Sequence, residues 1–139
     1  MTPIDQMVTS KLEHLSALVF ARDMDVVDEL WCDLGFNFFG SEQGESAGTR
    51  DELATLLRNL FAQPYQISWD WEKTMVDQQG DLVWASADSQ LVITYPDRTE
   101  HKPYRLVCIF QKIDAHWHWR LFSGSEPAAS PESSPMTGV

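Results

Sequence analysis

Residues 67–72 read Ile-Ser-Trp-Asp-Trp-Glu, and at this stretch the period of the sequence changes from helical to alternating. Large apolar side chains alternate with polar ones, as they do in a strand that buries one face. The alternation begins after Pro64 and continues towards Val76. Gln79-Gly80-Asp81 then has the composition of a tight turn, so residues 82–95 are predicted to return as an antiparallel partner strand.

Two more strands are predicted downstream of this pair. Pro96-Asp97-Arg98 turns the chain, and residues 104–113 form a nearly continuous apolar run, which predicts a strand buried on both faces. Asp114-Ala115-His116 is a short connection into a last strand over residues 117–123. The second half of the chain is therefore predicted to be a four-stranded antiparallel meander.

Upstream of Pro64 the apolar residues follow a helical period. A stripe over residues 4–19 predicts one amphipathic helix. Asp23 is expected to cap a second, shorter helix that ends before Gly35. Thr49 and Glu52 have the spacing of a capping box, so a third helix should begin there. Residues 36–39 lie between two glycines and read as a brief strand, and the polar residues 41–48 read as a loop.

These elements predict an α+β fold in which three N-terminal helices pack in the concave face of a curved, mainly antiparallel sheet. We expect one cone-shaped domain over residues 1–127, followed by a disordered tail over residues 128–139, which is small, polar and rich in proline and serine. A sheet with two apolar faces needs a second cover. A homodimer formed through the sheet is the expected one.

Composition excludes several classes of partner. The 139 residues carry a formal net charge of −11, which disfavours nucleic acid and anionic membranes. No stretch reaches the roughly 18 consecutive apolar residues of a membrane span, and the first ten residues do not resemble a signal peptide, so a cytoplasmic location is expected. Cys32 and Cys108 are neither a disulfide framework nor a zinc motif. His116 and His118 lack an evident third ligand, so no metal and no cofactor is predicted.

Three local motifs carry a family resemblance. They are Ala-Arg-Asp-Met-Asp at 21–25, Gly40-Ser41-Glu42 leading to Gly48-Thr49, and Trp-His-Trp-Arg-Leu-Phe-Ser-Gly-Ser-Glu-Pro at 117–127. In this order they resemble the SnoaL-like and ketosteroid isomerase-like families of the nuclear transport factor 2-like superfamily, over residues 4–127. The resemblance implies a cone that encloses a pocket. It implies no single activity, because the superfamily includes isomerases, dehydratases, cyclases and association domains.

The residues of steroid isomerisation are absent from the matching positions. In the ketosteroid isomerase-like proteins that this sequence resembles, the general base aligns with Asn37. The tyrosine and the second acid, which hold the enolate oxygen in those proteins, align with Leu15 and Ile109. An amide cannot accept a proton near neutral pH, and the two aliphatic side chains cannot donate a hydrogen bond. A histidine common in the last strand of SnoaL-like proteins aligns with Ser123. Steroid-type chemistry is therefore not expected.

Asp88, Arg105 and Tyr104 are the remaining catalytic candidates. If Asp88 points into the cone, it could act as a base, while Arg105 or Tyr104 stabilises developing negative charge. In the competing interpretation, Asp88 and Arg105 pair with each other or face solvent, and the rarity of unpaired buried ions favours it.

An aromatic-lined pocket is the other prediction. The candidate ligand-binding residues, which could equally fill the core, are Trp31, Asn37, Trp69, Trp71, Trp84 and Trp119. The preferred hypothesis is a domain that binds a small hydrophobic molecule without a complete catalytic set. An enzyme with non-steroid proton transfer, such as a dehydratase, cyclase or isomerase, is the first alternative. An association domain without a ligand is the second.

Overall fold

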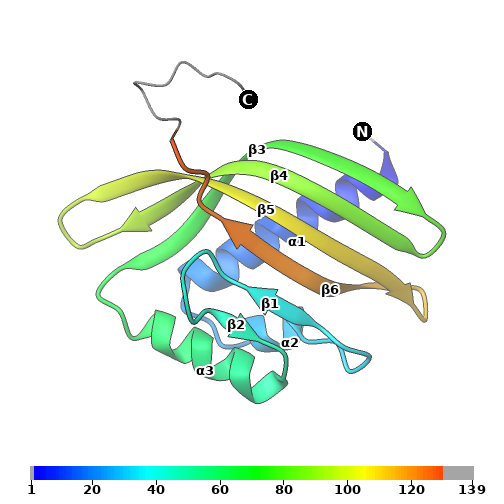
Figure 1. Ribbon diagram of the computed structural model, residues 1–139, viewed down its shortest axis with the longest axis horizontal. Helices are drawn as coiled ribbons and strands as arrows, with labels where there is room; N and C mark the ends of the chain where they lie inside the picture. The colour runs from blue at the N-terminus through cyan, green and yellow to red at the C-terminus, as the bar shows by residue number, and fades with distance from the viewer. Residues whose placement is uncertain (1, 130–139) are drawn as a thin grey trace.

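The computed structural model describes residues 2–129, and the predicted disordered tail lies outside them from residue 130 onward. The chain order places two helices first, then a small hairpin, a third helix and four long strands (Figure 1). The elements are α1 (Pro3–Phe20), α2 (Val26–Leu30), β1 (Asn37–Phe39), β2 (Ser46–Ala47), α3 (Arg50–Phe61), β3 (Gln66–Gln79), β4 (Leu82–Thr94), β5 (Thr99–Ile113) and β6 (His116–Ser125). The α+β class and the curved sheet are confirmed.

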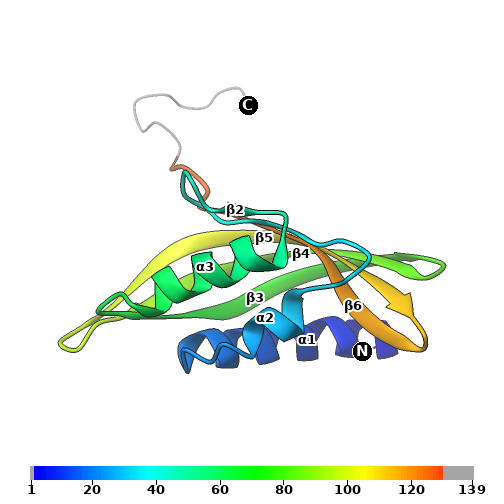
Figure 2. The same cartoon turned by 90° about the horizontal axis from the view of Figure 1, so that it is seen from below.

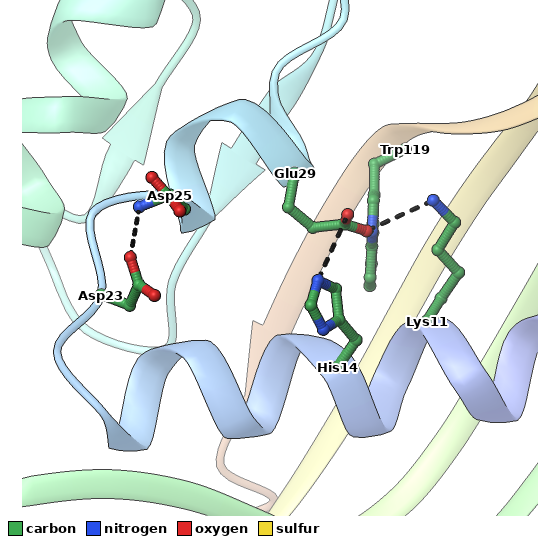
Figure 3. A network of polar contacts seen from close by, with 6 residues as sticks. All are labelled: Lys11, His14, Asp23, Asp25, Glu29 and Trp119. Carbon is green, nitrogen blue, oxygen red and sulfur yellow. Dashed lines mark hydrogen bonds and ion pairs between the residues drawn. The ribbon is translucent and has the colours of Figure 1, made fainter.

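Helices α1 and α3 begin where side chains satisfy their first N–H groups. Thr49 and Glu52 form the predicted capping box of α3. The prediction for α2 was wrong by two residues: its N-cap is Asp25, and the Asp23 carboxylate instead accepts a hydrogen bond from the Asp25 N–H (2.9 Å; Figure 3). Asp23 therefore shapes the turn between α1 and α2. No helix in the described part of the chain is long and apolar enough to cross a bilayer.

The sheet has six strands in the order β2-β1-β6-β5-β4-β3. The predicted meander is confirmed, since β3 to β6 pair antiparallel with their neighbours. The β1–β2 hairpin extends the sheet beyond β6. Within the hairpin the two strands are antiparallel, and β1 pairs with β6 in parallel. The second hairpin strand lies in the segment that was predicted to be a loop. The first strand of this hairpin places Asn37–Phe39 beside the last strand, although about 80 positions separate the two strands in the sequence.

The two faces of the long strands differ in exposure. Ala85, Leu106 and Phe110 face the helices and are buried, whereas Trp84 and Val107 are 44% and 43% exposed on the opposite, outer face. In the single chain, residues 104–113 are thus not buried on both faces as predicted, because every second side chain points away from the helices. The helix α1 runs along one side of the sheet, on the same side as α2 (Figure 2).

A glutamate ties the first two helices to β6. Glu29 of α2 accepts hydrogen bonds from Lys11 Nζ of α1 (3.3 Å) and from Trp119 Nε1 of β6 (3.0 Å; Figure 3). His14 Nε2 lies 3.8 Å from the other carboxylate oxygen. Trp119 is completely buried, so this bond satisfies an indole N–H deep in the core.

Candidate functional site

A cavity of about 280 Å³ lies between α1, α3 and the inner face of the sheet. Its size is close to the lower end of small-molecule sites, about 300 Å³. Most of its wall is aliphatic or aromatic, and the side chains come from both helices and from the long strands, among them Leu15, Leu57, Ile67, Ile93 and Phe122. The polar residues that line it include Glu42, Glu45, Lys102 and Glu126.

Trp69 organises the aromatic part of the wall. Its ring stacks on Trp71, with centroids 5.6 Å apart, and meets the rings of Tyr104 and Phe122 edge-on at 5.9 and 6.2 Å. The Ser16 hydroxyl on α1 accepts a hydrogen bond from the Trp69 backbone N–H (2.9 Å). Because β3 is an edge strand, this contact both satisfies its backbone and holds Trp69 in place.

Tyr104 presents a phenol to the cavity from β5. The residue is only 4% exposed, and burial, together with the charge of Glu45, raises the pKa of its hydroxyl far above the usual value. Burial outweighs the opposite, smaller effect of the neighbouring Trp69 indole, whose Nε1 is buried without a hydrogen-bond partner among the described residues. Tyr104 therefore remains a protonated donor at neutral pH, beside the unpartnered Trp69 N–H.

The rim of the cavity is built from two motifs that are distant in sequence. The hairpin loop after β1 closes with a hydrogen bond from the Gly40 N–H to the Glu45 carbonyl (2.7 Å), and the Glu45 carboxylate accepts from the Glu42 N–H (3.0 Å). A Cβ at Gly40 would lie 2.7 Å from the Glu45 Cβ, so a larger residue there would force the loop to shift. The Ser41 hydroxyl donates to Glu126 Oε2 (3.1 Å), which joins the loop to the end of β6.

Glu45 is the titratable group best suited to proton transfer at this rim. Burial raises the pKa of its carboxyl, and the negative charges of Glu42 and Glu126 act in the same direction. Backbone N–H groups of Glu42 and Ser41 offset part of the increase in pKa. A carboxyl with a raised pKa and a protonated phenol thus line one cavity, an arrangement found where proton transfer is catalysed.

The structure separates the three catalytic candidates. Tyr104 lines the cavity, but Asp88 and Arg105 do not. They face each other across β4 and β5, with Arg105 Nε 3.2 Å from Asp88 Oδ1 and about half of each side chain exposed. The expectation that either points into the cone is not met, because both positions share the outer face with Trp84 and Val107. The competing interpretation, a mutual pair, is the one observed.

Of the predicted ligand-binding residues, only Trp69 lines the cavity. The others have different surroundings: Trp31 donates to Asp33, Asn37 is exposed, Trp71 donates to the Leu12 carbonyl, Trp84 is on the outer face and Trp119 is in the core. Strand alternation alone cannot make this distinction, since it does not say which face is concave.

The sequence interpretation missed Glu45 as a site residue and assigned no role to Glu126, which lies among the polar residues at the end of the last strand. A signal for them existed, because Glu126 belongs to the third motif and Glu45 to the loop of the second. Of the positions aligned with steroid-isomerase groups, Leu15 lines the cavity, whereas Asn37 and Ile109 do not. Within residues 2–129 no three His, Cys, Asp or Glu side chains are grouped as a metal site would require.

Comparison with solved structures supports the same architecture. ActVI-ORFA from Streptomyces coelicolor superposes with a TM-score of 0.76 at 17% identity, covering 90% of this chain and 98% of that one. A nuclear transport factor 2-like superfamily protein from Salmonella enterica superposes with a TM-score of 0.76 at 13% identity, covering 96% of this chain and 97% of that one. A protein from Streptomyces avermitilis, provisionally assigned as a dehydratase, gives 0.77 at 10% identity, covering 91% and 96%. Such identities establish the fold alone.

Sequence comparison identifies the family directly. No curated protein sequence is significantly similar to this chain. The model of the SnoaL-like domain, however, matches residues 8–129, which include every element of the sheet and all but the first residues of α1. The chain therefore belongs to the SnoaL-like domain family.

Proposed function

We propose that this protein binds a small, predominantly apolar molecule in the cavity lined by Trp69 and Tyr104. The observation that carries the proposal is the cavity itself: about 280 Å³ of space bounded mainly by aliphatic and aromatic side chains, with a few polar groups. An apolar molecule that enters such a site releases water from its own surface and from the wall. The polar groups then orient it.

The intrinsic fluorescence of Trp69 offers a test with a matched control. Trp69 lines the cavity, whereas Trp84 lies exposed on the outer face. We expect 2-phenylethanol and acetophenone to change tryptophan emission in the wild type and in Trp84→Phe, and to change it far less in Trp69→Phe. A response that disappears in Trp84→Phe and persists in Trp69→Phe would contradict the proposed site.

Proton-transfer catalysis is the second candidate function. It is supported by Glu45, whose raised pKa suits a general acid or base and which lines the same cavity as the Tyr104 phenol. This candidate replaces Asp88 with Glu45 as the proposed base, because Asp88 is outside the cavity. If a bound compound is turned over, Glu45→Gln should abolish turnover, while a neutral compound such as acetophenone should still bind. Unchanged turnover would exclude Glu45.

A homodimer is proposed as the assembled form. The outer face of the sheet carries Trp84 and Val107, both more than two-fifths exposed, beside Met75. The cross-strand register places Met75, Ser86 and Val107 in one row, so the patch is continuous over three strands. The sheet of a second copy would cover it. If a dimer forms but no compound enters the cavity, the association role replaces the binding role.

A further inference from the structure

We infer that the molecule bound in this cavity carries a protonated amine at the rim and a hydrogen-bond acceptor near Tyr104 and Trp69. The inference rests on the proposed binding function and assigns a chemical class to its ligand. It is supported by the charges at the rim, by the aromatic rings around them and by the buried Trp69 N–H, which has no partner among the described residues.

The charge at the rim selects against anions. Glu42, Glu45 and Glu126 line the cavity together with a single cation, Lys102. The three carboxylates are gathered by the hairpin loop, through the bond from Ser41 to Glu126 and the bond from the Glu42 N–H to Glu45. An entering ammonium group would be attracted to them, while a carboxylate or phosphate would be repelled by all three.

Two tyrosines add a surface on which a cation can lie. Tyr65 and Tyr95 line the cavity with ring centroids 5.5 Å apart. The Arg98 guanidinium already lies over the Tyr95 ring, 3.9 Å from its centroid. The faces of aromatic rings attract cations, and cages of such rings are used to recognise ammonium ligands. The rim therefore combines the two kinds of group that bind an amine.

The donors at the aromatic end of the cavity point to a second group on the same ligand. Trp69 Nε1 is buried and has no hydrogen-bond partner among residues 2–129. Tyr104 lines the same cavity next to the Trp69 ring, and its hydroxyl can also donate. A buried donor without a partner costs about 1–3 kcal/mol, so an acceptor oxygen on the ligand would recover part of that cost.

Calorimetric titration of the wild type with three probes of one shape tests the charge requirement. Tyramine carries an ammonium group, tyrosol a neutral hydroxyl and 3-(4-hydroxyphenyl)propionate a carboxylate, and all three share the phenol. We expect tyramine to bind at least tenfold more tightly than the propionate, with tyrosol between them. Equal affinities, or the reverse order, would overturn the inference.

Three variants assign the effect to residues. Glu45→Gln should lower the affinity for tyramine at least fivefold and change the affinity for tyrosol less than twofold. The control is Glu72→Gln, which alters an exposed carboxylate outside the cavity and should change neither affinity. Tyr104→Phe should lower the affinity for both probes alike, because it removes the donor to their common phenol. If Glu45→Gln lowers the affinities for tyramine and tyrosol equally, the assignment of the amine to the rim is wrong.

The two proposals fail in different ways. If tyrosol binds in the cavity and tyramine gains nothing over it, the amine inference is overturned and the proposed binding function stands. If none of the three probes binds, and 2-phenylethanol and acetophenone also leave the Trp69 emission unchanged, both proposals are overturned.

Discussion

At the scale of single residues, the cavity depends on one missing methyl group. A Cβ at Gly124 would lie 1.8 Å from the Tyr104 hydroxyl oxygen and 2.5 Å from the ring carbon that bears it. Glycine is needed here for space, since residue 124 is not among the described glycines with positive φ. The position of Tyr104 in the cavity wall is therefore determined by β6 as well as by its own strand.

Gly124→Ala should consequently displace the Tyr104 ring. We expect a loss of stability of about 1–3 kcal/mol, as in other overpacked cores, and weaker binding of tyrosol. Urea unfolding of the single variants and of Gly124→Ala combined with Tyr104→Leu provides the test. In the Tyr104→Leu background, Gly124→Ala should cost much less stability, because the shorter side chain leaves room for the added methyl group. If the alanine costs the same in both backgrounds, the proposed clash is wrong.

At the scale of elements, Glu29 joins α1 and α2 to β6 through Lys11 and Trp119. Glu29→Ala should destabilise the protein by about 1–3 kcal/mol, because it leaves the buried Trp119 N–H without an acceptor. Glu29→Gln keeps an acceptor oxygen in the same place and should cost less. Urea denaturation of the two variants is the measurement. Equal losses would show that the hydrogen bond to Trp119 contributes nothing.

At the scale of the whole molecule, the exposed outer face of the sheet is the proposed dimer interface. Val107→Glu would place a charge in the middle of the proposed interface, where burying it without a partner is costly. We expect the dimer dissociation constant to rise at least tenfold, or by about 1.4 kcal/mol. Sedimentation equilibrium measures it, with Leu34→Glu as the control because Leu34 is 64% exposed in a loop. A wild-type monomer would contradict the prediction.

The sequence by itself determined the elements and their class. Helical and alternating periods, the capping box at Thr49 and the turn at Gln79-Gly80-Asp81 are local patterns, and local patterns are set by neighbouring residues. They identified the three helices and the four long strands. The three motifs then indicated the family, which the match over residues 8–129 confirms.

Only the tertiary structure decided which side chains share the cavity. Trp69 and Trp84 both lie in strands that the sequence predicts, yet Trp69 lines the cavity and Trp84 faces outward. Strand alternation defines two faces but does not say which of them the helices cover. Glu45 and Glu126 meet at the rim only because β1 pairs with β6. Pairing between segments so distant in sequence is a property of the assembled sheet, and no local pattern encodes it.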